Sequence, residues 1–145
     1  MTNLNIKLSV ELNEEQEERL YDFLCDELSH NDFLVLDEET KEAHLLESQE
    51  EMLWAFNTSF IMANLKPGIS DDMSENDLVE FEKSIDKIKG DLCESANGFV
   101  KGITDWKELL VEGARVDGYG HFLSSYDGNE YELKFEGIDI LVYKQ

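Results

Sequence analysis

The sequence predicts an α+β fold, a small and mainly antiparallel sheet formed by strands at both ends of the chain and packed with three or four helices. Apolar residues alternate with polar ones near both ends, which is the period of a half-buried strand, whereas between the ends they recur every three or four residues, which is the period of a helix. The length of 145 residues is that of one domain, so we expect residues 1–145 to form a single acidic domain.

The first strand is expected over residues 4–12, where leucine, isoleucine and valine alternate with polar residues. Asn13 is suited to cap a helix, and Gln16 stands three residues later, so the two form a capping-box pattern. A helix is therefore expected over residues 13–29. The apolar run at residues 33–36 predicts a second strand.

The central part of the chain is expected to be helical. A capping pattern at Ser48 precedes an apolar helical face over residues 52–63, and a third helix opens at Ser74. Its apolar residues from 78 to 99 follow steps of three and four, the strongest helical period in the chain. The polar stretch before Ser48 is unassigned, apart from a short strand or turn expected over residues 43–46.

The last part of the chain returns to strands after a short helix capped by Thr104. Residues 131–135 and 138–142 both alternate, and the turn residues Glu136 and Gly137 join them, which predicts a C-terminal hairpin. A further short strand is expected at residues 121–123.

Charge is the most unusual property of the composition. The chain has 34 acidic and 12 basic residues and a formal net charge of −22. Residues 1–80 contribute 21 of the acids and four of the bases. Binding to nucleic acid or to an anionic membrane needs lysine and arginine, so we expect neither. The expected partner is a basic protein surface, in particular that of a nucleic-acid-binding protein.

The acidic first half is the candidate binding surface. DNA presents one negative charge per about 1.7 Å of its axis, and carboxylates gathered on one continuous outer face would imitate that density. An alternative is a solvated face that serves solubility alone. The residues expected to contact the partner are Glu14, Glu15, Glu18, Asp22, Asp26, Glu38, Glu39 and Glu42.

The glycine-rich stretch at residues 117–128 allows two interpretations. His121 and Asp127 could serve a small hydrolase as base and orienting acid, together with a nearby serine. The glycines could instead form tight turns in a structural loop, which is the favoured interpretation because no nucleophile-elbow or phosphate-loop motif occurs. We expect no enzyme activity, no cofactor and no metal site, since the three histidines are far apart in sequence and no metal-binding motif is present.

The same stretch carries a resemblance to a known group of proteins. Gly-Tyr-Gly-His-Phe-Leu-Ser-Ser-Tyr-Asp-Gly at 118–128, followed by a Glu-rich strand and a closing Tyr143, resembles the C-terminal end of small uncharacterised proteins encoded by bacteriophages and mobile elements. The resemblance covers residues 115–143 and departs at Lys144, where arginine is usual. It implies a phage context, in which small acidic proteins are often inhibitors of host nucleases and some mimic DNA.

Compartment and assembly complete the expectations. Cys25 and Cys93 lack a paired spacing and are expected to be reduced. No signal peptide or membrane-spanning run is recognised, so we expect a cytoplasmic protein, in the host cytoplasm if it is encoded by a phage. A second functional hypothesis is a homo-oligomeric interaction module that uses an apolar helix face, with charge serving solubility.

Overall fold

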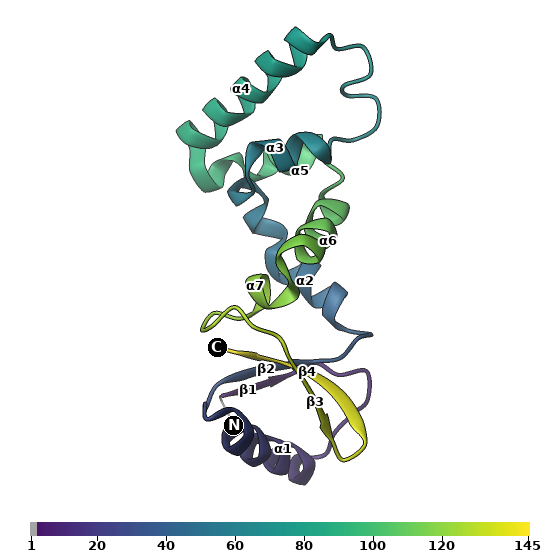
Figure 1. Cartoon of the computed structure of the whole chain (residues 1–145), viewed down its shortest axis with the longest axis vertical. Coiled ribbons are helices and arrows are strands. Elements are labelled where there is room, and N and C mark those ends of the chain that lie inside the picture. Colours follow the sequence, from purple (N-terminus) through teal and green to yellow (C-terminus); the bar gives the residue numbers. More distant parts are fainter. Residues whose placement is uncertain (1–2) are drawn as a thin grey trace. The chain divides into compact units, whose positions relative to one another are not determined.

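The computed structural model describes residues 3–145 and confirms the α+β prediction (Figure 1). The chain divides into two compact units. The sheet unit consists of the chain up to residue 45 together with residues 114–145, and the helical unit consists of residues 46–113. A single cooperative domain over the whole length stays a prediction.

The sheet has four strands in the order β1-β2-β4-β3. Strand β1 (Leu4–Ile6) runs parallel to β2 (Phe33–Leu36). Strand β4 (Ile138–Lys144) is antiparallel both to β2 and to β3 (Tyr131–Phe135), and β3 forms the predicted C-terminal hairpin with it. Strands from both ends of the chain therefore form one mainly antiparallel sheet, as predicted.

The first strand is shorter than the sequence predicts, because it ends at Ile6 and not at residue 12. After this strand the backbone N–H and the hydroxyl of Ser9 donate hydrogen bonds to the Asp37 carboxylate, at 2.8 and 2.6 Å. Leu8 and Leu12 still pack against the core from outside the strand. Both are only partly buried, and 46% of Val10, which lies between them in the alternating pattern, is exposed, so the pattern of burial is not kept beyond the strand.

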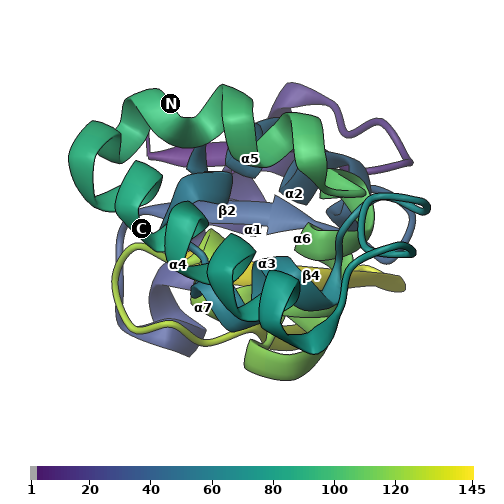
Figure 2. The ribbon, with the colours of Figure 1, turned by 90° about the horizontal axis from the view of Figure 1, so that it is seen from above.

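Helix α1 (Glu14–Leu28) begins and ends where the sequence predicts. The side chain of Asn13 accepts a hydrogen bond from the backbone of Gln16, and the Gln16 side chain accepts one from the backbone of Asn13, which completes the capping box. Leu20 and Leu24 are fully buried against the sheet. Figures 1 and 2 both show this helix covering one face of the sheet, with β2 passing in front of it in Figure 2.

The two faces of the sheet are both buried near β2 and β4. Val35 and Val142 belong to the core cluster under α1, whereas Leu34 and Leu141 point to the opposite face and are also buried. Strand β2 is buried at every position. This burial explains why its sequence is a continuous apolar run instead of an alternating one.

Helices and 3-10 turns make up the rest of the chain. In chain order they are α2 (Lys41–Gln49), η1 (Glu50–Ala55), α3 (Thr58–Ala63), α4 (Glu75–Leu92), η2 (Cys93–Ala96), α5 (Asn97–Ile103), α6 (Trp106–Asp117) and α7 (Tyr119–Leu123). The unit boundary falls within α2 and within α6. None of the helices formed by residues 3–145 combines the length and the apolar character needed to cross a membrane.

The prediction for residues 43–63 is wrong in two respects. Residues 43–46 lie in α2 and form neither a strand nor a turn. The helix expected behind Ser48 is divided into the end of α2, η1 and α3, and α3 has its own cap at Asn57, whose side chain accepts a hydrogen bond from the backbone of Ser59 at 3.1 Å. A competing N-cap inside the apolar stretch therefore restarts the helix.

Helix α4 begins as predicted, with a capping box between Ser74 and Asp77. The apolar stripe expected up to residue 99 is interrupted at Cys93, where the backbone takes a φ of 51° and the helix ends. Only Ile85 is fully buried on this helix, and 51% of Leu92 is exposed.

The short helix expected after Thr104 is α6, which begins at Trp106. Thr104 itself ends α5, and its hydroxyl donates a hydrogen bond to the Val100 carbonyl at 2.7 Å. One smaller prediction near the C-terminus is wrong. Residues 121–123 belong to α7 and not to a strand. Gly118, with a φ of 91°, separates α6 from this short helix, and glycine takes such a φ without steric cost.

Candidate functional site

Helix α1 presents a stripe of carboxylates on the side opposite its buried leucines. Glu14, Glu18, Asp22 and Asp26 follow one another at intervals of four residues, and all four are exposed. Side chains four residues apart lie on the same side of a helix, about 6 Å apart along its axis. The stripe is therefore a continuous row of negative charge along the helix.

The charge density of α1 is close to that of one DNA strand. Its 15 residues carry seven acidic side chains, and all seven are exposed. A helix of this length extends over about 22 Å, which gives one carboxylate per about 3 Å. A single strand of DNA carries one phosphate per about 3.4 Å along the axis.

The single basic residue of α1 is bound outside the helix. Arg19 donates two hydrogen bonds to Glu136 in the β3–β4 turn, at 2.9 and 3.0 Å. These hydrogen bonds lower the pKa of Glu136 and raise that of Arg19. The guanidinium is thus held to a carboxylate of the hairpin, beside the row of acids on the helix.

The stripe has an energetic cost for the helix itself. Like charges four residues apart destabilise a helix by about 0.2–0.5 kcal/mol per pair. The stripe contains three such pairs, from Glu14 to Asp26. The helix dipole favours an acid in the first turn, where Glu14 lies, but this gain does not reach Asp22 and Asp26. Local helix stability alone would therefore not select the second half of the stripe.

The second acidic group lies where β2 ends. Glu38, Glu39 and Glu42 are exposed, and Glu38 forms an ion pair of 3.1 Å with Lys41. The preceding Asp37 holds the turn in place, since its carboxylate accepts hydrogen bonds from Ser9 and from the backbone of residues 39 and 40. Although burial acts to raise the pKa of Asp37, these hydrogen bonds outweigh it and lower the pKa.

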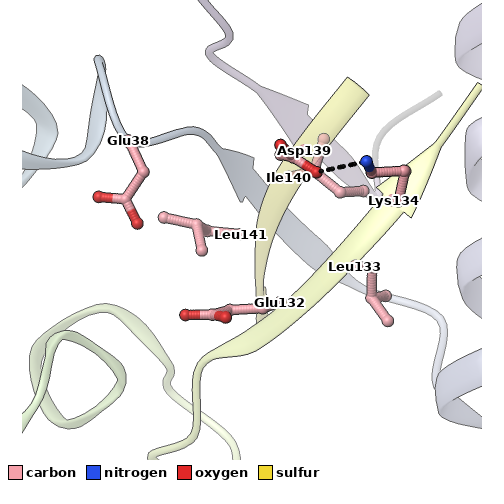
Figure 3. Close-up of a pocket in the computed structure, with 7 residues that line it drawn as sticks. All are labelled: Glu38, Glu132, Leu133, Lys134, Asp139, Ile140 and Leu141. Carbon is pink, nitrogen blue, oxygen red and sulfur yellow. Dashed lines mark ion pairs between the residues drawn. The ribbon is translucent and has the colours of Figure 1, made fainter. Parts of the chain in front are cut away.

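An open hollow of about 480 Å³ lies beside this group, on the face of β3 and β4 that is turned away from α1 (Figure 3). The Glu38 and Glu132 carboxylates approach it from two sides of Leu141. At the other end Lys134 and Asp139 form an exposed ion pair of 3.5 Å. Three of the four charged residues that line the hollow are acidic, so its field is negative.

The expected acidic residues do not form one continuous face. Helix α1 covers the sheet face to which Ile140 contributes, whereas Glu38 lies beside Leu141, the next residue of β4, which points to the opposite face. The eight residues are all exposed. They lie in two groups, Glu14, Glu15, Glu18, Asp22 and Asp26 on α1 and Glu38, Glu39 and Glu42 after β2.

The charge asymmetry along the sequence does not match the division into units. The sheet unit contains 19 acidic and six basic residues, a net charge of −13, and the helical unit contains 15 and six, a net charge of −9. Both units are strongly acidic. What distinguishes α1 is the local arrangement of its charge and not the unit to which it belongs.

A polar cluster that the sequence analysis missed surrounds Tyr143. The Tyr143 hydroxyl is buried and donates a hydrogen bond of 2.6 Å to Glu130. Burial and this carboxylate raise the pKa of Tyr143 far above its usual value. The Lys41 ammonium lies 4.4 Å from the centre of the Tyr119 ring, next to Glu38. Only the fold brings together these residues, which are up to 105 positions apart in the sequence.

The glycine-rich stretch at 117–128 is organised as a structural loop. The Ser124 hydroxyl donates to the Lys144 carbonyl at 2.7 Å and accepts from the backbone of residues 126–128. Gly120 lies against the backbone of residues 128 and 129, where a Cβ atom would stand 2.5 Å from the Gly128 carbonyl oxygen. The loop is thus closed on itself, and position 120 has no space for a side chain.

The hydrolase hypothesis requires His121 and Asp127 to interact, and the loop directs them to different partners. His121 is exposed and its ring contacts Phe122. Asp127 accepts hydrogen bonds from Tyr131 at 2.6 Å and from the backbone of Asn129 at 3.0 Å. Burial acts to raise the pKa of Asp127, but these hydrogen bonds outweigh it and lower the pKa to about 2. Within residues 3–145, no three His, Cys, Asp or Glu side chains are grouped so that they could hold a metal ion.

Comparison with known proteins gives no further guide. No protein-family model, curated protein or solved structure matches the chain.

Proposed function

We propose that this chain is a non-catalytic binding protein that uses the exposed carboxylates of α1 to engage a basic protein surface. More specifically, we propose that the chain inhibits a host enzyme by mimicking DNA and occupying the nucleic-acid site of that enzyme. The observation that carries it is the density of exposed carboxylates on α1, seven over about 22 Å of helix, which is close to the density of phosphates along one DNA strand.

Two further observations support the proposal. Arg19, the one base on α1, is already bound to Glu136, which leaves seven exposed carboxylates on the helix for a partner. Complementary charge also speeds encounter with a basic surface. By analogy with the phage-encoded proteins that residues 115–143 resemble, we propose that such an inhibitor would act in a host cytoplasm.

The contribution of the second acidic group is expected to be smaller. Glu38 is already paired with Lys41, and this group lies beside the opposite face of the sheet from α1. Reversal of Glu38, Glu39 and Glu42 should therefore weaken binding less than reversal of the α1 stripe.

The experiment is affinity capture from a bacterial host lysate at low salt, followed by elution with a salt ramp. The test bait carries Glu18→Lys, Asp22→Lys and Asp26→Lys. The matched control carries Asp72→Lys, Glu94→Lys and Glu108→Lys, three exposed acids of the helical unit, so both baits have the same net charge. Circular dichroism checks that both baits are folded.

We expect the wild-type chain and the control to capture the same basic protein and the α1 variant to lose it. The purified partner should then release a fluorescent DNA duplex when the wild-type chain is added, as measured by anisotropy, and elution should follow ionic strength. If both variants lose the partner equally, then binding depends on net charge alone, which would contradict the role of α1. Capture without release of DNA would contradict DNA mimicry.

A further inference from the structure

Strand β3 has an open edge. It is the outermost strand of the sheet and pairs with β4 alone among the described strands. An unpaired edge presents a row of backbone N–H and C=O groups that can pair with another strand.

The hairpin turn determines which backbone groups face outward. Glu136 and Gly137 both have positive φ, 48° and 81°, as in a two-residue type I′ turn, so Phe135 and Ile138 form the closing hydrogen-bonded pair. Hydrogen-bonded and non-hydrogen-bonded pairs alternate along an antiparallel ladder. The backbone groups of Glu132 and Lys134 therefore point away from β4, toward the open edge.

The sequence of β3 is complementary to itself. It reads Tyr-Glu-Leu-Lys-Phe, an aromatic residue, an acid, a leucine, a base and an aromatic residue. If a second copy pairs antiparallel about Leu133, Glu132 of each copy stands opposite Lys134 of the other. Tyr131 then stands opposite Phe135, and Leu133 opposite its own equivalent.

The hydrogen-bond pattern allows this register. In a pairing centred on Leu133, the facing residues are Glu132 and Lys134, whose backbone groups point outward. Each such pair exchanges two hydrogen bonds, and the two-fold symmetry provides both pairs. A register shifted by one residue would instead bring an outward-pointing residue opposite one already bonded to β4.

We propose that β3 is a self-association edge, through which two copies of this chain join their sheets into one sheet of eight strands. The side chains favour a second copy over an unrelated strand. Glu132 lies opposite Leu141 within its own sheet and so has no cation across the ladder. The second copy would supply Lys134, which lies opposite Asp139 in its own chain and would then stand between two acids.

The net charge of −22 opposes dimer formation, so the dimer is expected to be weak at low salt and to strengthen as salt screens the repulsion. This dependence is opposite to that expected for binding of a basic partner to α1. The two proposals can therefore succeed or fail separately.

The first test is sedimentation velocity at physiological salt over a range of concentrations, with Glu132→Lys, Lys134→Glu and the double exchange. Each single variant replaces two attractive cross-strand pairs by two repulsive ones, which should raise the dimer dissociation constant by about tenfold or more. The double exchange should restore dimerisation. A wild-type chain that remains monomeric, or single variants that dimerise like the wild type, would overturn the proposal.

The second test uses the two-fold axis and does not depend on charge. In a chain with Cys25→Ser and Cys93→Ser, Leu133→Cys should form a disulfide-linked dimer under mild oxidation, because non-hydrogen-bonded antiparallel partners have Cα atoms about 4.5 Å apart. Glu132→Cys is the control, since its counterpart across the axis is position 134. Equal cross-linking of both variants would refute the register, and so would an uncross-linked Leu133→Cys chain that sediments as a dimer.

Discussion

Helices α1 and α4 begin alike and differ in what they bury. Each opens with a capping box, at Asn13 in one and at Ser74 in the other. Helix α1 buries Leu20 and Leu24 completely, whereas α4 buries only Ile85 completely. The local signals that start a helix are thus independent of the tertiary contacts that decide how much of its apolar face is covered.

Their outer faces differ as well. Helix α4 mixes both signs of charge and holds exposed ion pairs, Lys83 with Glu80 and Lys87 with Asp91. Helix α1 carries seven acids, and its one base is bound to the hairpin. Mixed charge is typical of a solvated face, whereas a row of one sign is costly for the helix and suited to a partner of opposite charge.

The largest expected difference between the helices is in the free energy of unfolding. Leu24→Ala should lower it by about 2–5 kcal/mol because it leaves a cavity in the core. Leu92→Ala, at a position that is 51% exposed, should lower it by less than about 1 kcal/mol. Urea titration followed by circular dichroism measures both, and equal losses would contradict the difference in burial.

The same titration tests whether the chain is one cooperative domain. Both tryptophans belong to the helical unit and all five tyrosines to the sheet unit. If the chain unfolds as one domain, tryptophan fluorescence and hydrogen exchange in β4 should respond together to Leu24→Ala. A change confined to β4 would show that the units unfold separately.

Removal of the N-cap side chain should lower the free energy of unfolding equally in the two helices, because the cap is the feature that they share. Asn13→Ala and Ser74→Ala each remove a side chain that accepts a backbone hydrogen bond, and each should lower the free energy of unfolding by about 1 kcal/mol. Thermal unfolding by calorimetry provides the measurement. A much larger loss at one cap would mean that this residue also has a tertiary role.

Reversal of a single charge should change the free energy of unfolding least. The direction of that change should differ between the two helices. Glu18→Lys converts repulsion from Glu14 and Asp22 into attraction, which should stabilise the fold by about 0.5–1 kcal/mol while it weakens partner binding. Lys87→Glu in α4 loses Asp91 but gains Lys83, so little change is expected. If Glu18→Lys destabilises the fold, then the stripe is structural and not a binding device.

The sequence predicted those parts of the fold whose causes are local. The cap at Asn13, the stripe of α1 and the hairpin around Gly137 depend on residues within a few positions of one another. Helix α2 was missed because the turn before it depends on Asp37 and its contact with Ser9, 28 positions away. The break of the long stripe at Cys93 likewise follows from a backbone conformation that the periodicity does not contain.

The candidate site was predictable to the same extent. The α1 carboxylates are exposed because they alternate with a buried stripe, which the sequence contains. The separation of Glu38 from them depends on which face of β4 Leu141 occupies, a matter of strand register. The cluster around Tyr143 could not be found in advance, because its members come from distant segments.

The close approach at Gly120 offers a way to recognise distant relatives of this chain. Any side chain there would collide with the peptide between residues 128 and 129, whereas His121 faces solvent and could be exchanged freely. A homologous protein should therefore keep glycine at this position even where the neighbouring histidine is replaced. Glycine without histidine would mark shared architecture, and histidine without glycine would mark coincidence.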